Sequence, residues 1–230
     1  MAPFATLYTS RALKHAKSLK ILAVANFNNL EIAVDETFDM FTTPKTPEYL
    51  AKFPMGKYPV METADGFCLA ETAAMAFFVA ESGPKREQLL GVDVKQRALI
   101  QQWISLADSE VFANCLPLVL QLFGALPKDE KVRMEKETAM VRAMRRIEGH
   151  LKGVRKEGKR WFVDGEEPSL ADLSVAASLF WGFMFYIDEE MRKDYPETIK
   201  WYRTLLEVEE VKKTFGEPEM VQVRPESVKL

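Results

Sequence analysis

The sequence predicts two domains of different class, a small α/β domain followed by an all-α domain. Strand and helix patterns alternate over residues 3–81. Gly83 and Pro84 then break the chain, and long helical patterns replace strand patterns from Asp93 onward. A chain of 230 residues is long enough for two small domains. We therefore expect four segments, an α/β domain at 1–82, a linker at 83–92, a helical domain at 93–216 and an irregular tail at 217–230.

The first domain has the predicted element order β-α-β-α-β-β-α. Apolar residues at helical spacing indicate its first helix, and Thr46 followed by Pro47 is a typical start for the second. Asp65-Gly66 is a typical hairpin turn between the last two strands. The strands are expected at residues 3–8, 31–34, 58–62 and 67–69. The helices are expected at residues 11–26, 46–53 and 71–81.

The second domain should be built around one buried helix. Residues 170–186 are apolar on nearly every face, which is typical of a helix enclosed by other helices. Ser169 and Asp172 form a capping-box pattern at its start, so we assign both residues a structural role. Four further helices are expected at residues 96–123, 130–157, 189–193 and 197–207.

Composition and charge exclude several classes of protein. Lys and Arg number 31 against 34 Asp and Glu, a balance that argues against a nucleic-acid partner. Cys68 and Cys115 have neither disulfide nor metal-ligand spacing, so we expect buried thiols, a reducing compartment and no metal. Charges interrupt the N-terminal apolar region, which excludes a signal peptide. The longest uncharged apolar run, residues 173–187, is shorter than the roughly 20 residues of a membrane span. We expect a cytoplasmic protein.

The segment Gly56-Lys57-Tyr58-Pro59-Val60 places a proline inside a strand pattern. Proline cannot donate to a sheet ladder, so it should lie at an edge or a bend. A cis Tyr58-Pro59 bond would leave the main-chain N–H and C=O of Tyr58 free to pair with a small peptide as an added strand. The alternative is an ordinary trans proline at a sheet edge, because only about 5–6% of such bonds are cis.

Glu71 and Thr72 begin a helix directly after a strand. The free N–H groups and the dipole of a helix start can hold a carboxylate. Thr72 adds a hydroxyl donor and Glu71 can accept from an ammonium, so together they suit an amino-acid head group. The alternative is simple capping by an acid and a hydroxyl.

Thr9, Ser10 and Arg11 follow the first strand, beside the expected peptide site. A hydroxyl there can donate to a thiolate, and a cation lowers the pKa of a thiol. The alternative is that they are turn residues and a solvated charge. The two histidines, His15 and His150, have no acid–nucleophile pattern around them, and we assign them no catalytic role.

The motifs KYP, AET and SLAD, in that order, resemble those of the cytosolic glutathione transferases over nearly the whole chain. Residues 46–82, 100–111 and 169–182 are similar to the transferase-like domain of the gamma subunit of translation elongation factor one. The resemblance implies a thioredoxin-like first domain with a cis proline, glutathione as co-substrate and a homodimer. It also implies a set of glutathione-binding residues, Lys45, Lys57, Tyr58, Pro59, Glu71, Thr72 and Asp108, the last of which reaches the partner subunit's glutathione.

Two functions follow from this resemblance. The first is a transferase that conjugates glutathione to small electrophiles, with Ser10, Thr9 or Arg11 activating the thiol. The second is a non-catalytic module that docks subunits of the elongation factor. The sequence shows no clear match to the tyrosine or serine that activates the thiol in other transferases. The gamma subunit normally continues into a linker and another domain, whereas this sequence stops at Leu230, which favours the enzyme.

Overall fold

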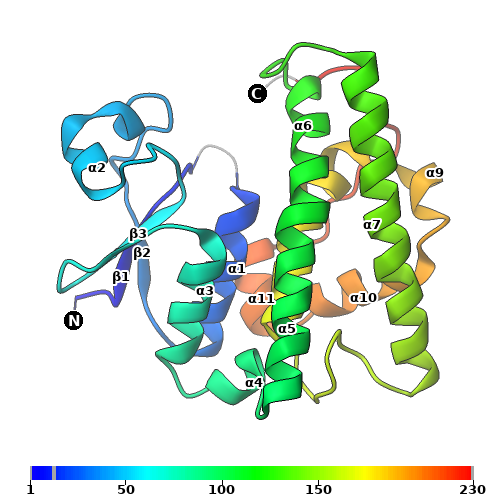
Figure 1. Ribbon diagram of the computed structural model, residues 1–230, viewed down its shortest axis with the longest axis horizontal. Helices are drawn as coiled ribbons and strands as arrows, with labels where there is room; N and C mark the ends of the chain where they lie inside the picture. Colours follow the sequence, from blue (N-terminus) through cyan, green and yellow to red (C-terminus); the bar gives the residue numbers. More distant parts are fainter. Residues whose placement is uncertain (1, 12–13, 229–230) are drawn as a thin grey trace.

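A four-stranded mixed sheet forms the first domain in the computed structural model, which describes residues 2–11 and 14–228 (Figure 1). The strand order is β2-β1-β3-β4, with β1 parallel to β2 and antiparallel to β3, and β4 antiparallel to β3. Leu7 of β1 aligns with Val34 of β2 and Met61 of β3. The strands are β1 Ala5–Tyr8, β2 Ile32–Val34, β3 Val60–Thr63 and β4 Cys68–Leu69.

The three helices that the sequence predicts complete this domain, together with a short 3-10 turn that it does not predict. Figure 1 shows α1 and α3 between the sheet and the helical domain, whereas α2 lies away from the helical domain. Thr46 caps α2, because its side chain accepts from the N–H of Tyr49. The elements are α1 Ala16–Phe27, η1 Thr43–Lys45, α2 Pro47–Lys52 and α3 Thr72–Glu81.

The first helix begins five residues later than the sequence pattern predicts. The carbonyl of Lys14 accepts from the indole Nε1 of Trp181 at 2.9 Å, and His15 has extended backbone. This hydrogen bond ties the segment before Ala16 to the helical domain. Residues 12 and 13, part of the predicted helix, lie outside the described residues.

The second domain is all-helical, and its long helices lie where the sequence predicts them. Two π-helical segments, η2 and η3, continue α5 and α8. The sequence did not predict α4, which lies in the expected linker, or α11. The elements are α4 Arg86–Leu90, α5 Val94–Leu106, η2 Ala107–Phe112, α6 Ala113–Leu122, α7 Glu130–Lys156, α8 Leu170–Trp181, η3 Gly182–Tyr186, α9 Glu189–Arg192, α10 Pro196–Leu206 and α11 Glu209–Phe215.

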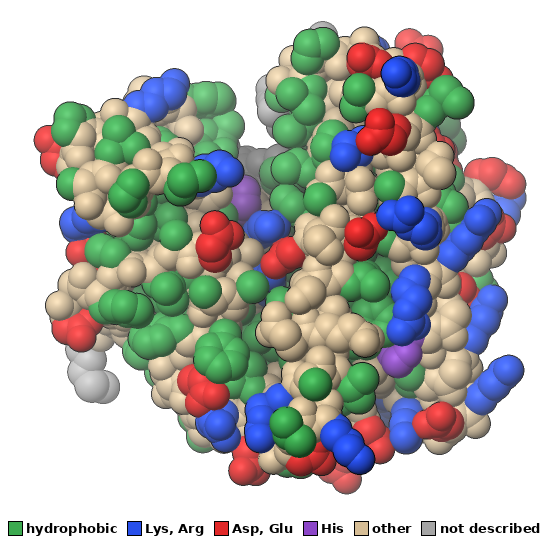
Figure 2. Space-filling view, viewed as in Figure 1, with side chains coloured by type: hydrophobic (Ala, Val, Ile, Leu, Met, Phe, Trp, Pro, Cys, Tyr) green, Lys and Arg blue, Asp and Glu red, His purple; other side chains and the backbone are tan. Residues whose placement is uncertain are grey.

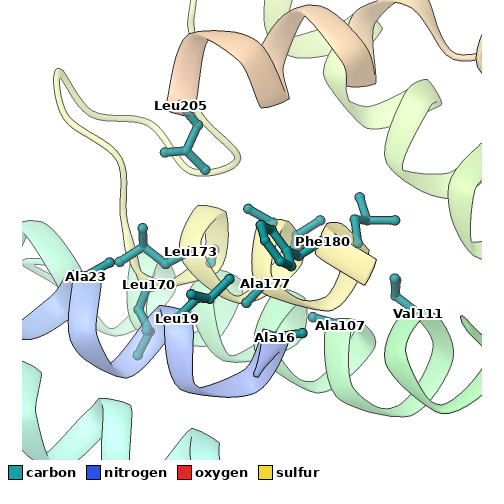
Figure 3. Packing of buried hydrophobic residues seen from close by; sticks show 14 of the residues in the cluster. Ala16, Leu19, Ala23, Ala107, Val111, Leu170, Leu173, Ala177, Phe180 and Leu205 are labelled. Atoms are coloured by element: carbon teal, nitrogen blue, oxygen red, sulfur yellow. The ribbon is translucent and has the colours of Figure 1, made fainter. Parts of the chain in front are cut away.

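Helix α8 is the centre of the molecule. Every one of its residues is buried, and Figure 3 shows its side chains packed against α1 of the first domain and against Leu205 of α10. The two domains therefore share one apolar core. The α8 side chains labelled there are Leu170, Leu173, Ala177 and Phe180, and those of α1 are Ala16, Leu19 and Ala23.

The predicted capping box at the start of α8 is present. The carboxylate of Asp172 accepts from the N–H of Ser169 at 3.0 Å, and the side chain of Ser169 accepts from Ala171. The same carboxylate also accepts from the N–H of Phe162 at 3.0 Å and from Nε1 of Trp201 at 2.9 Å. Asp172 thus joins three segments of the helical domain.

The last described residues, 217–228, contain no helix or strand but pack on the helical domain. The N–H of Val221 donates to the carbonyl of Phe183, and that of Val228 donates to the carbonyl of Leu122, each at 2.8 Å. This segment therefore covers the ends of two core helices.

One helix among the described residues is long and apolar enough to cross a membrane. It is the continuous stretch Val94–Leu122, formed by α5, η2 and α6, with a mean hydropathy of 1.2 over its most apolar window. This helix differs from the longest uncharged apolar run of the sequence, residues 173–187. In the structure 44% of the Val94–Leu122 window is buried, and a core helix satisfies the same criterion. Its buried residues Trp103 and Val111 belong to the shared core.

Candidate functional site

A cleft of about 540 Å³ lies between the two domains. Figure 2 shows the surface hollowed between the two lobes. The cleft combines a cationic and polar floor from the first domain with an apolar wall from the helical domain. Its lining residues are His15, Lys17, Lys52, Phe53, Pro54, Met55, Lys57, Tyr58, Pro59, Val60, Cys68, Ala70, Glu71, Thr72, Phe112 and Leu116.

The Tyr58-Pro59 peptide bond is cis, as the family resemblance implies. Among the described residues, no hydrogen bond outside the sheet ladder uses the main-chain N–H or C=O of Tyr58. The Tyr58 ring lies 5.4 Å from the rings of both His15 and Phe38, measured between centroids. The cleft thus offers an unpaired main-chain donor and acceptor beside the start of β3.

Glu71 and Thr72 start α3 at the edge of the cleft, and both carry an energetic cost. Glu71 has a φ of 65°, a left-handed conformation that costs a residue with a side chain of order 1–3 kcal/mol. Its side chain makes no capping hydrogen bond. Thr72 is 5% exposed, and its Oγ1 is buried without a partner among the described residues. A ligand that donates to the carboxylate and accepts from the hydroxyl would offset both costs.

The predicted lysines differ in position. Lys57 lines the cleft with an exposed side chain, whereas Lys45, in η1, is exposed outside the cleft. Lys52 also lines the cleft, although the sequence analysis did not select it, and its ammonium is 2.7 Å from the carboxylate of Glu62. Among the described residues, Lys17 pairs with Asp108 and Lys52 with Glu62, whereas Lys57 has no ion pair.

Asp108 lies in η2 and is already paired within its own chain. Its Oδ1 is 3.3 Å from Lys17 and 3.4 Å from the buried Lys20, both on α1. It does not line the cleft itself. Asp108 thus holds α1 against the helical domain and neutralises part of the charge of two lysines.

Thr9, Ser10 and Arg11 do not line the cleft. They line a separate hollow of about 600 Å³. The Thr9 hydroxyl is buried and lies 2.7 Å from the hydroxyl of Ser18 on α1. Arg11 is 3.4 Å from Glu36. The structure therefore does not bring the three predicted activating residues to the cleft.

His15, which the sequence analysis set aside, lines both the cleft and the second hollow. It is the N-cap of α1 but makes no capping hydrogen bond with its side chain. Its Nδ1 lies 3.4 Å from the hydroxyl of Ser18, and its ring contacts those of Tyr58 and Trp181. Burial, with a smaller contribution from Lys17, lowers the pKa of His15 to about 4. No local motif marks this residue, because the helical domain completes its surroundings.

The helical domain supplies the apolar wall of the cleft. Phe112 of η2 and Leu116 of α6 face the first domain, and the ammonium of Lys17 lies 4.6 Å from the centre of the Phe112 ring. Cys68 of β4 also lines the cleft and is half-buried, which differs from the expected buried thiol. Burial raises the pKa of Cys68, so its thiol is protonated at neutral pH. No cluster of three or more metal-ligating side chains occurs in the described part of the chain.

Two domain families match this chain. The family described as glutathione S-transferase, N-terminal domain, matches residues 16–82. The family described as glutathione S-transferase, C-terminal domain, matches residues 106–209. A glutathione S-transferase-like protein of a Fusarium species is 42% identical over 97% of this chain and 98% of its own length. Elongation factor 1-gamma of Artemia salina is 29% identical over 87% of this chain. The matched region spans 44% of the length of that protein.

Solved structures show the same fold. The glutathione S-transferase-like domain of elongation factor 1-gamma from Saccharomyces cerevisiae has a TM-score of 0.77 and 21% identity, covering 98% of this chain and 100% of that one. A glutathione transferase of Phanerochaete chrysosporium, solved in complex with oxidized glutathione, has a TM-score of 0.80 and 19% identity, covering 93% and 96%. These matches confirm the predicted two-domain architecture and the predicted resemblance.

Proposed function

Because the chain belongs to the glutathione S-transferase family, we propose that it binds glutathione in the cleft and joins the glutathione sulfur to small electrophiles. The buried, unpartnered hydroxyl of Thr72 is the observation that carries this proposal. A buried polar group without a partner costs about 1–3 kcal/mol. A carboxylate seated at the start of α3 would relieve that cost and would also accept from the free N–H groups of the helix.

The parts of glutathione match the groups along the cleft. The γ-glutamyl carboxylate would lie at Thr72, and its ammonium would donate to Glu71. The cysteine backbone would pair with the N–H and C=O of Tyr58, next to Pro59, as an added antiparallel strand. The glycine carboxylate would lie near Lys57. This order directs the sulfur along the cleft toward the start of α1.

The reaction needs glutathione as its thiolate. A free cysteine thiol has a pKa of about 8.5 and is mostly protonated at neutral pH. In the proposed reaction the thiol proton leaves to solvent and a sulfur lone pair forms the new carbon–sulfur bond. With an aryl halide, the carbon–halogen bond then breaks and halide leaves. The apolar side chains of Phe112 and Leu116 suit the electrophile on the opposite wall.

We also propose a homodimer in which the first domain of one chain contacts the helical domain of its partner. The large apolar side chains that are about half exposed include Phe67 after the β3–β4 turn and Phe77 of α3, 48% each, and Leu99 of α5, 47%. A second copy would cover apolar area that water otherwise contacts. Light scattering at micromolar concentration should give twice the chain mass, and a monomer mass would contradict this assembly. A cytoplasmic location remains part of the proposal, in accord with two free thiols.

A non-catalytic docking module is the second candidate. The similarity to elongation factor 1-gamma in sequence and fold favours it. In this alternative the chain would recover elongation-factor subunits from an extract and would not accelerate conjugation. The relatives that are 42% identical over nearly their full length carry the transferase-like name, which favours the enzyme.

Turnover of 1-chloro-2,4-dinitrobenzene with glutathione tests the proposed function. We expect conjugation above the rate without enzyme, saturable in glutathione. Lys57→Ala and Lys45→Ala form a matched pair, because both lysines are exposed but only Lys57 lines the cleft. Lys57→Ala should weaken glutathione affinity, and Lys45→Ala should leave it unchanged. Absence of both glutathione binding and turnover in the wild type would contradict the proposal.

A further inference from the structure

We propose that His15 holds the glutathione sulfur as a thiolate, donating a hydrogen bond from Nε2 of a neutral imidazole whose tautomer is set by the hydroxyls of Ser18 and Thr9. This inference rests on the proposed function, since it places the sulfur by the contacts of glutathione with Tyr58. It assigns the activating role to a residue outside the segment that the sequence analysis selected.

His15 lies beside Tyr58, and this position brings it near the proposed site of the glutathione cysteine. The cysteine of glutathione pairs with the main chain of Tyr58, and the ring of His15 lies 5.4 Å from the ring of that residue. His15 lines the same cleft and stands at the start of α1, toward which the sulfur points. The hydroxyls of Thr9 and Ser10 lie in the other hollow and cannot serve the sulfur directly.

Two hydroxyls behind His15 determine which ring nitrogen carries the proton. The hydroxyls of Thr9 and Ser18 are 2.7 Å apart, and that of Ser18 is 3.4 Å from Nδ1 of His15. Each hydroxyl has one proton to donate. When Thr9 donates to Ser18 and Ser18 donates to Nδ1, the imidazole carries its proton on Nε2. Nε2 is then the N–H donor of a ring that lines the cleft.

The surroundings of His15 keep the ring neutral. Burial is the main cause, and Lys17, on the same helix, also disfavours a second positive charge. The other neighbours are Tyr58, which precedes β3, and the uncharged Trp181 of α8. A neutral donor binds a thiolate better than a thiol, because hydrogen bonding to the charged form favours that form. The donor therefore lowers the pKa of the glutathione thiol without itself titrating near neutral pH.

Two other groups in the cleft could act on the sulfur. The ammonium of Lys17 is 3.3 Å from Asp108 and lies over the Phe112 ring, so part of its charge is already neutralised. The second group that could stabilise the thiolate is the hydroxyl of Tyr58. Lys17→Met and Tyr58→Phe remove these groups while leaving His15 and the Tyr58 main chain in place.

The test is to measure the pKa of glutathione bound to the full-length chain, using the ultraviolet absorbance of the thiolate as the readout. In the wild type we expect this pKa to lie below the value of about 8.5 for a free cysteine thiol. His15→Ala should raise it by about one to two pH units, the size expected for one hydrogen bond to a charged group. His15→Gln, which keeps an N–H donor, should restore part of the shift. Ser18→Ala should cause a smaller rise.

Binding of S-methylglutathione separates this inference from the proposed function, because that probe has no ionisable thiol. All of these variants should bind it as the wild type does. If the wild type does not bind it, the proposed function fails. If only the His15→Ala variant fails to bind S-methylglutathione, His15 is a binding residue and the inference is wrong. An unchanged thiol pKa in His15→Ala, or a rise only in Lys17→Met or Tyr58→Phe, would also overturn the inference.

Discussion

Two helices of this protein, α3 and α8, start with the same residue types and use them in opposite ways. Each start combines an acid with a hydroxyl, Glu71 with Thr72 in α3 and Ser169 with Asp172 in α8. At α8 the carboxylate accepts four hydrogen bonds and both residues are buried. At α3 the acid is exposed with a φ of 65°, and the hydroxyl is buried without a partner in the described part of the chain.

The two helix starts differ in whether the protein itself satisfies their polar groups. The polar groups of α8 are satisfied by the protein itself, so they stabilise the fold. The polar groups of α3 cost stability in the free protein and face a cleft, which is typical of groups reserved for a ligand. The residue types alone do not distinguish the two roles, whereas their hydrogen bonds do.

Asp172→Ala should produce the largest effect on stability. The substitution leaves several buried donors unpaired, including the indole N–H of Trp201, and each such group costs about 1–3 kcal/mol. We expect the free energy of unfolding to fall by about 3 kcal/mol or more in chemical denaturation. Glutathione affinity of the remaining folded protein should be unchanged. A variant of normal stability would remove the contrast between the two helix starts.

The start of α1 at His15 extends the comparison, since it also lies in the cleft without a capping hydrogen bond. The pKa of His15 is about 4 in the folded chain and about 6.5 in the unfolded chain. As the pH falls from 6.5 to 4, the unfolded chain takes up a proton that the folded chain does not, so stability decreases, by up to about 3 kcal/mol. Denaturation at several pH values should show this loss, and His15→Gln should show less of it. Equal pH dependence in both proteins would contradict the burial of His15.

Glu71→Gly should separate binding from stability. Glycine adopts a positive φ without strain, so the free energy of unfolding should stay the same or rise. The lost carboxylate should weaken glutathione binding by about ten- to a hundredfold, the effect of one hydrogen bond to a charged group. Calorimetry and denaturation on the same sample measure both. A loss of stability with normal affinity would assign Glu71 to capping.

Ser169→Ala should have the smallest effect among these changes. Loss of a helix N-cap typically costs about 1 kcal/mol, and Asp172 keeps its bonds to Phe162 and Trp201. The melting temperature should fall while glutathione affinity stays normal. Weaker glutathione binding in this variant would show that the start of α8 also serves the ligand.

Local patterns in the sequence were sufficient to predict the fold and some of the first-domain residues of the cleft, but not His15 or Lys52. The strand and helix periods, the turn at Asp65-Gly66 and the capping box of α8 are short-range signals, and the structure contains all of them. Tyr58, Glu71 and Thr72 were found because a proline in a strand and a helix start after a strand are also local signals. All three line the cleft.

The remaining site residues depend on contacts between distant segments. Phe112 and Leu116 reach the cleft only because the helical domain packs on α1. His15 carries no local signal, because its surroundings include the ring of Trp181, far along the chain. Thr9, Ser10 and Arg11 line a separate hollow, and no local pattern distinguishes that hollow from the cleft. The periodicity of apolar residues in the sequence does not predict such contacts between distant segments.

Calorimetric titration of glutathione into the wild type and Thr72→Val tests the central claim most directly. Valine keeps the shape of threonine but removes the buried, unpartnered hydroxyl. We expect measurable binding in the wild type, at least about a tenfold weaker affinity in Thr72→Val, and a variant at least as stable as the wild type. Unchanged affinity together with reduced stability would contradict a ligand-binding role, because it would make Thr72 a structural residue like Ser169.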